Sequence, residues 1–269
     1  MTATHYYRCF LGIVLREALR FVHQRERFVA ALVRPLVWLL VFAAGFRAAL
    51  GLSIIPPYET YVTFEVYIIP GLIGMIQLFN GMQSSLSMVY DREMGSMRTL
   101  LVSPLPRWYL LMCKLLAGTF VSILQVYAFL LIAYFFGIEM PPLGYLTLFP
   151  ALVVSGLMLG GLGMLLSSVI KQLENFAGIM NFVIFPMFFL SSALYPLWKM
   201  KESSLLLYQI CLANPFTHAV ETIRFALYGQ VNFLSLLITV GVLALFVGLA
   251  IYGYNPARGM MSRKTVTTG

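Results

Sequence analysis

The residues that could do chemistry are few and scattered along this chain. Its 269 residues include 10 acidic residues and 3 histidines, and Asp91 is the only aspartate. His218 and Glu221 would share one face of a helix, but no further metal ligand stands near them. Capping and a pair between Glu221 and Arg224 at i,i+3 explain them better than zinc does. The three cysteines have no ligand-like spacing, which favours packing thiols over a metal site or a disulfide framework.

Motifs for catalysis and for nucleotide binding are also missing from the sequence. It has no Ser/His/Asp set, no HExxH and no glycine-rich phosphate loop followed by Lys-Ser/Thr. We therefore expect no catalytic residue, no metal and no cofactor in this chain. A lipid-modifying membrane enzyme is the weakest of three hypotheses, because acids and histidines do not cluster.

The elements that must position these residues are membrane helices. Hydrophobic residues make up 60% of the chain and charged residues 10%, which is more apolar surface than a soluble domain of this size can bury. Spanning a hydrocarbon core of ~30 Å takes ~20 apolar residues. We predict an all-α integral membrane protein with six transmembrane helices. The predicted spans are Val29–Leu50, Val62–Tyr90, Trp108–Gly137, Leu143–Ile170, Phe176–Leu197 and Val231–Tyr254.

The distribution of positive charge predicts the orientation. Fourteen of the 18 Lys and Arg residues fall on the side of the N-terminus, and the other side keeps only Arg47, Lys199, Lys201 and Arg224. This bias places both termini in the cytoplasm. The net charge of +8 is thus a topology signal, and no nucleic-acid partner is needed to explain it.

Three parts of the chain follow from this topology. Residues 1–28 form an amphipathic helix with a basic face, suited to the cytoplasmic headgroup layer, and they lack the cleavage site of a signal peptide. Residues 29–254 form the transmembrane domain. Residues 255–269 form a basic cytoplasmic tail.

The cytoplasmic loop 91–107 has the pattern of a docking surface. Met94, Met97, Leu100 and Leu101 recur at helical spacing between charged residues, and prolines then stop the helix. A short helix with an exposed Met/Leu edge suits a partner protein. The same edge could instead pack against the protein's own helices.

Two helix faces inside the membrane stand out. The second span carries a polar face of Gln77, Asn80, Ser84 and Ser87, which serves either interhelical hydrogen bonds or a solute path. The fifth span carries an aromatic face of Phe182, Phe185 and Phe189, which suits varied apolar ligands but also lipid or core. Small residues one turn apart in the fourth span, among them Gly156 and Gly160, predict close helix packing.

An external segment follows the fifth span. Asn214 is a good helix cap, Pro215 suits the first turn, and Gly229 is a natural stop. The ionisable residues of the spans, Arg34 among them, are expected near span ends, where they can snorkel to water. An ion-coupled secondary carrier therefore has little support, although it remains the alternative.

Three motifs in order carry a resemblance to a known family. Residues 90–105 read YDREMGSMRTLLVSPL, residues 190–197 read LSSALYPL, and residues 214–217 read NPFT, with Arg224 following. With six spans and an N-terminal amphipathic helix, the chain resembles the membrane permease subunits of type-2 ABC exporters over essentially its whole length.

The resemblance implies a division of labour among these residues. The loop after span two would be a coupling helix on an ABC ATPase subunit, with matching positions at Asp91, Arg92, Glu93, Gly95, Leu100, Leu101 and Pro104. Spans two and five would line a pathway between two protomers, with Gln77, Asn80, Ser84, Asn181, Phe182 and Phe185. An external re-entrant hairpin, residues 198–229, would form the outer gate together with Tyr195, Asn214, Pro215 and Arg224.

The same resemblance implies the partners. ATP and Mg²⁺ would sit on separate cytoplasmic ATPase subunits, and a second copy or a related permease chain would complete the pathway within the lipid bilayer. The cargo would be an amphipathic, lipid-like or drug-like molecule or a lipid-linked sugar. The sequence does not rank these substrates, nor does it separate a homodimer from a heterodimer.

Overall fold

The chain forms a bundle of helices of very different lengths. The structure, a computed structural model, describes residues 3–23, 25–46, 56–58, 62–93, 105–170 and 172–254. Within these ranges it contains helices and no strand, so the all-helical prediction is confirmed there. The helices are α1 Ala3–His23, α2 Arg25–Phe46, α3 Phe64–Glu93, α5 Arg107–Phe135, α6 Gly144–Val169, α7 Leu173–Phe189, α8 Leu197–Ser203, α9 Leu205–Ala213, α10 Pro215–Leu227 and α11 Phe233–Gly253.

Apolar composition explains the long helices, since in lipid a helix satisfies its own backbone hydrogen bonds. Of the described helices, α3, α5, α6 and α11 are long and apolar enough to cross a membrane. Two shorter apolar helices are Leu32–Val41, within α2, and α7. These six helices overlap the six predicted segments, and the protein is a multi-pass membrane protein. The fifth predicted span is too long, because α7 ends at Phe189 and residues 190–196 are not helical. That the two shorter helices also cross the bilayer stays a prediction.

Helix α3 is the centre of the bundle. In its most apolar stretch 83% of the residues are buried, against 17% in α11, which lies at the periphery. Small residues bring α3 and α6 together: a Cβ on Gly81 would lie 2.8 Å from the Cα of Gly160. The close packing predicted for the fourth span is therefore present, and its partner is α3.

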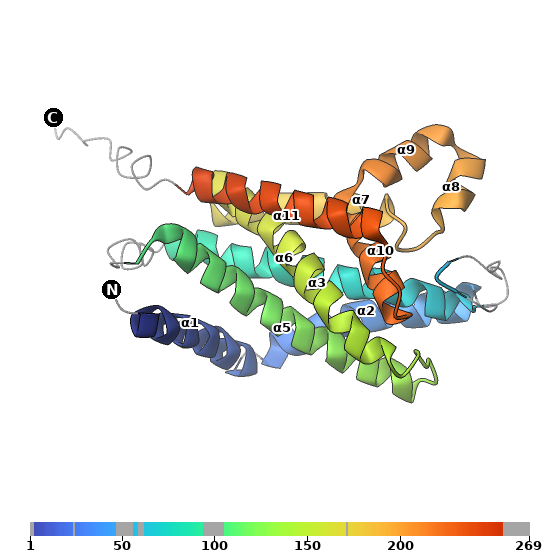
Figure 1. Cartoon of the computed structure of the whole chain (residues 1–269), viewed down its shortest axis with the longest axis horizontal. Coiled ribbons are helices and arrows are strands. Elements are labelled where there is room, and N and C mark those ends of the chain that lie inside the picture. Colours follow the sequence, from blue (N-terminus) through green and yellow to red (C-terminus); the bar gives the residue numbers. More distant parts are fainter. Residues whose placement is uncertain are drawn as a thin grey trace.

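The two ends of the bundle carry different elements (Figure 1). The start of α1, the end of α3, the start of α5 and the end of α11 lie at one end of the molecule. Helix α1 packs there against α5, where the Tyr109 hydroxyl donates a hydrogen bond of 2.7 Å to the carbonyl of Tyr6. The location of α1 in the headgroup layer stays a prediction, and residues 255–269 lie outside the described ranges.

Helices α8, α9 and α10 lie at the opposite end (Figure 1). Helix α10 begins as its sequence predicts, with Asn214 as the cap and Pro215 in the first turn, and Gly229 follows with a φ of 67°. Only a residue without a Cβ adopts that left-handed backbone easily, so the helix ends there. α10 turns back into the bundle and packs against α3, α6 and α11.

Candidate functional site

The polar face of α3 is directed into the bundle, where Gln77 and Asn80 are paired with neighbouring helices. Gln77, which is 1% exposed, donates a hydrogen bond of 2.8 Å from Nε2 to the Leu152 carbonyl and accepts one of 2.6 Å at Oε1 from Ser155. The amide of Asn80 donates to the side-chain oxygen of Gln125 on α5. Two of the three α3 residues assigned to the pathway thus join α3 to α5 and α6.

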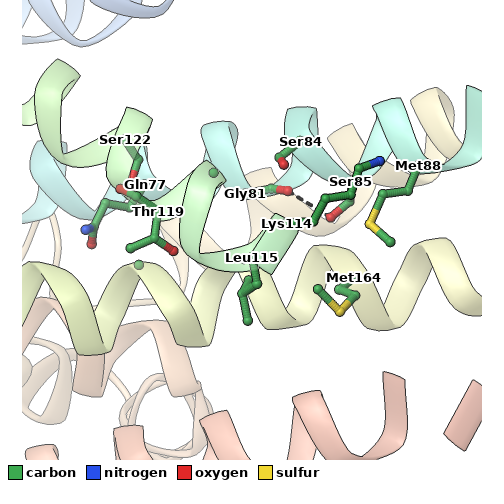
Figure 2. Close-up of a pocket in the computed structure, with 13 residues that line it drawn as sticks. Gln77, Gly81, Ser84, Ser85, Met88, Lys114, Leu115, Thr119, Ser122 and Met164 are labelled. Atoms are coloured by element: carbon green, nitrogen blue, oxygen red, sulfur yellow. Dashed lines mark hydrogen bonds between the residues drawn. The ribbon is translucent and has the colours of Figure 1, made fainter. Parts of the chain in front are cut away.

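A narrow polar crevice runs between α3, α5 and α6 (Figure 2). Ser84, Ser85, Thr119 and Ser122 line it together with Gln77, and Lys114 lines it as well. The space holds about one water molecule. An amphipathic solute needs far more room than this, so the crevice is not a solute path in this conformation.

The aromatic face of α7 has the opposite environment. Phe182 is 78% exposed, Phe185 is 42% exposed, and Asn181 is exposed beside them. The ring of Phe185 stacks on that of Phe189, as the sequence predicts, with 6.3 Å between the ring centroids. The structure therefore separates the residues assigned to the pathway into an internal group on α3 and an accessible group on α7.

A buried arginine organises the end of the bundle that carries α10. Arg224 is 4% exposed, and its Nη1 donates a hydrogen bond of 2.6 Å to Oε1 of Glu221, the partner that the sequence predicts. Nη2 donates one of 2.8 Å to the Ser192 carbonyl, which also accepts a bond of 3.1 Å from the Tyr67 hydroxyl. The guanidinium carbon lies 4.0 Å from the centre of the Tyr67 ring. These contacts join α10, α3 and the turn after α7.

Electrostatics keeps this arginine charged inside the protein. Burial alone would lower the pKa of Arg224, but the adjacent Glu221 carboxylate, together with smaller contributions from Tyr67 and Tyr58, more than offsets this, so the pKa is raised. Tyr58 packs edge-on to Tyr228, with 5.0 Å between their ring centroids, and burial raises the pKa of the Tyr58 phenol. The side-chain contacts of Arg224 make it a structural connector of this end of the bundle.

The other residues assigned to the outer gate lie at the same end. The Asn214 side chain accepts a hydrogen bond of 3.0 Å from the Phe216 amide, as a cap does, and its own amide donates to the carbonyls of Met187 and Leu190. Pro215 starts α10, whereas Tyr195 is 36% exposed in the turn before α8. Asn214 thus connects the end of α7 to the start of α10.

The segment assigned to ATPase docking is described only in part. Asp91, Arg92 and Glu93 form the last turn of α3, and Gly95, Leu100, Leu101 and Pro104 lie outside the described residues. The Asp91 carboxylate accepts a hydrogen bond of 2.8 Å from Nζ of Lys114, and both side chains are largely buried. Asp91 therefore links α3 to α5, whereas Glu93 is exposed.

Comparison with known proteins identifies the family. The model of the family described as "ABC-2 type transporter" matches residues 8–228, which is most of the chain. The chain belongs to the ABC-2 type transporter family. The fold described above, a helical multi-pass membrane bundle, agrees with this membership.

Relatives of this ABC-2 type chain carry permease names. It is 29% identical over 225 residues to "Putative transport permease ycf38" of Cyanophora paradoxa, covering 80% of this chain and 73% of that protein. It is 32% identical over 167 residues to "Probable multidrug ABC transporter permease YbhR" of Escherichia coli K12, covering 61% of this chain and 44% of that protein. It is 28% identical over 117 residues to "Nodulation protein J" of Rhizobium leguminosarum bv. viciae, covering 41% and 44%.

Membership in a permease family indicates a transport subunit rather than an enzyme. In the described part of the chain, no three His, Cys, Asp or Glu residues come together as metal ligands would. The sequence of this ABC-2 type chain gives no indication that Tyr67 and Ser192 are partners of Arg224. It also predicts Arg34 near a span end, whereas the Arg34 guanidinium lies over Phe79 at the middle of α3. No local sequence pattern indicates either contact, because each contact joins segments that are far apart in the chain.

Proposed function

We propose that this chain is the transmembrane permease subunit of an ATP-driven ABC exporter. The observation that carries the proposal is the match of residues 8–228 to the ABC-2 type transporter family. The sequence has no phosphate-binding loop of its own. A permease of this kind needs a motor, and cytoplasmic ABC ATPase subunits with bound ATP and Mg²⁺ would supply it.

The ATPase would dock on the loop that follows α3. Its two flanks, Glu93 and Arg107, lie at the same end of the molecule as the start of α1 and the end of α11 (Figure 1). The positive-inside pattern assigns that end to the cytoplasm of the bacterial inner membrane. The pair between Asp91 and Lys114 supports a transmitting role, since it fastens the end of α3 to α5. Movement of the loop would then reach both helices together.

The transport pathway would lie between two copies of this chain. The polar groups of α3 are used inside one protomer, whereas the Phe182, Phe185 and Phe189 face of α7 is accessible. An aromatic surface adapts to varied apolar molecules, so the cargo would be an amphipathic, drug-like or lipid-like compound. The name of the Escherichia coli relative, a multidrug transporter permease, supports the drug-like reading. The α10 end, with Arg224 and Asn214, would form the outer gate.

The test is co-expression with a candidate ABC ATPase from the same organism, followed by reconstitution in proteoliposomes. We expect Glu93→Lys and Leu100→Asp to abolish ATP-dependent export while the helices remain folded. Glu139→Lys, at an exposed acid in the loop between α5 and α6, outside both the docking loop and the gate hairpin, is the matched control and should transport normally. Normal export by both loop variants would refute the docking proposal. Transport driven by a proton gradient without ATP would establish the ion-coupled carrier instead.

A further inference from the structure

Arg34 is a cation within α2, one of the six predicted spans. It lies inside the apolar stretch Leu32–Val41, and its side chain is exposed on the protomer. The guanidinium carbon lies 3.7 Å from the centre of the Phe79 ring. Phe79 is at the middle of α3, about 20 Å from either end at ~1.5 Å per residue. Arg34 is therefore far from the depth at which a long side chain reaches headgroups and water.

Among the described residues, no oxygen accepts a hydrogen bond from this guanidinium, and its recorded contact is the aromatic ring. A ring face attracts the cation but leaves its five N–H groups available. A charged group at this depth is costly unless an opposite charge or water meets it. Arg34 thus needs an anionic partner that its own protomer does not provide in the described structure.

A second copy of this chain cannot provide a carboxylate at that depth. None of the 10 acidic residues lies in the central part of α2, α3, α5, α6, α7 or α11. Glu65 and Glu174 stand at helix starts, Asp91 and Glu93 at a helix end, and Glu221 already pairs with Arg224. Unless water alone meets the charge, the counter-charge therefore comes from a molecule other than this polypeptide.

The surroundings of Arg34 connect it to the accessible face of α7. Trp38 follows Arg34 by one helical turn, and its ring lies 5.9 Å from that of Phe189 on α7. Phe185 precedes Phe189 by one turn, and α2 and α7 run in the same direction (Figure 1). Arg34 and Phe185 therefore stand at similar depths, each about 6 Å from the Trp38 contact on the same side of it.

We propose that Arg34 binds the anionic group of an amphipathic molecule whose apolar part lies on the Trp38, Phe185 and Phe189 face. The chemistry that fits is a phosphate or carboxylate, which a guanidinium holds through two parallel hydrogen bonds. The aromatic rings take the hydrocarbon part. This assignment rests on the proposed function, because it makes the bound molecule the cargo and narrows the cargo to acidic amphiphiles.

The experiment measures binding to the whole purified chain in phosphatidylcholine nanodiscs. Trp108→Phe and Trp198→Phe leave Trp38 as the reporter, since the chain has 3 tryptophans. The probes are a brominated dodecyl phosphate, which quenches tryptophan, and the brominated alcohol of the same chain length as its neutral counterpart. The variants are Arg34→Gln, Arg34→Lys and the matched control Arg107→Gln, an exposed arginine at the start of α5.

We expect Arg34→Gln to weaken dodecyl phosphate binding by about ten- to hundredfold, the range for a charge-assisted hydrogen bond. Arg34→Lys should bind with an affinity between those of the parent and Arg34→Gln, because lysine keeps the charge but loses the two parallel hydrogen bonds. Arg107→Gln should match the parent. Binding of the alcohol should be the same in all variants, which also shows that the Trp38 environment is intact. An unchanged Arg34→Gln affinity, or an equal loss for the alcohol, overturns the proposal.

A second arm separates cargo from bilayer lipid as the source of the anion. Phosphatidylglycerol is added to the nanodiscs, and the dodecyl phosphate titration is repeated. An unchanged affinity supports a transported amphiphile, whereas strong competition assigns the site to a resident anionic lipid and overturns the cargo assignment. These measurements need no ATPase. If Arg34→Gln does not change dodecyl phosphate binding while ATP-driven export is intact, only this inference is refuted. If Glu93→Lys and Leu100→Asp do not uncouple export from ATP, only the docking proposal is refuted.

Discussion

Replacing Arg224 with Met tests whether the buried cluster holds the α10 end of the bundle together. The arginine donates two short hydrogen bonds, of 2.6 Å to Glu221 and of 2.8 Å to the Ser192 carbonyl. Without it the Glu221 carboxylate, whose side chain is 15% exposed, keeps its charge with no cation beside it. Removing one partner of a buried ion pair costs about 3–5 kcal/mol of unfolding free energy. We expect the loss for Arg224→Met to fall in this range.

The assay is titration with sodium dodecyl sulfate in mixed micelles, followed by circular dichroism, which reports the free energy of unfolding. Glu221→Gln in the Arg224→Met background removes the carboxylate that has lost its cation. The double variant should therefore recover about 2 kcal/mol of the unfolding free energy lost in Arg224→Met. Arg16→Met is the matched control, because the Arg16 side chain in its pair with Glu17 is 46% exposed. An exposed pair is worth about 0–1 kcal/mol.

The reasoning fails if Arg224→Met costs no more than Arg16→Met. It fails equally if the two substitutions at Glu221 and Arg224 are additive, because an ion pair in contact must show coupling between them. The first result would mean that the contacts of the arginine contribute little to the stability of this end. The second would mean that any loss comes from its contacts with Tyr67 and Ser192 and not from the pair with Glu221.

Three further changes test the packing around the site by the same measurement. Gly81→Leu should cost about 1–3 kcal/mol or more, because its Cβ meets backbone of α6, whereas Gly241→Leu on α11 meets nothing within 4 Å and should be tolerated. Gln77→Leu should cost about 0.6–1.7 kcal/mol by removing interhelical bonds, yet leave dodecyl phosphate binding unchanged. Asn214→Ala should cost about 1–2 kcal/mol and speed amide hydrogen exchange at Phe216, and exchange at the parent rate would contradict its role as the cap.

Much of the architecture could be predicted from local sequence. Each apolar run marked a helix, because a membrane helix satisfies its backbone hydrogen bonds within its own segment and needs no distant partner. The start of α10 at Asn214 and Pro215 followed from the same local logic, since a cap and a first-turn proline act within a few residues. Helix ends were less certain: α3 continues to Glu93, so Asp91 belongs to a helix rather than to the loop.

The direction of each helix face could not be predicted in this way. Gln77 and Phe182 both looked suitable for a pathway, but one bonds to α6 and the other is exposed on α7. A periodic pattern shows that residues share a face and leaves open which neighbour covers that face. That choice depends on how the helices pack.

Sequence by itself therefore determined the class of the protein, the positions of its helices and the family whose motifs it carries. Tertiary structure alone decided that Arg224 meets a carbonyl 32 residues earlier in the chain and that Arg34 lies over the middle of α3. The physical reason is that burial and pairing of a charge depend on atoms brought together by helix packing. Those atoms come from segments far apart in the chain, and the sequence of one segment does not indicate which other segment it contacts.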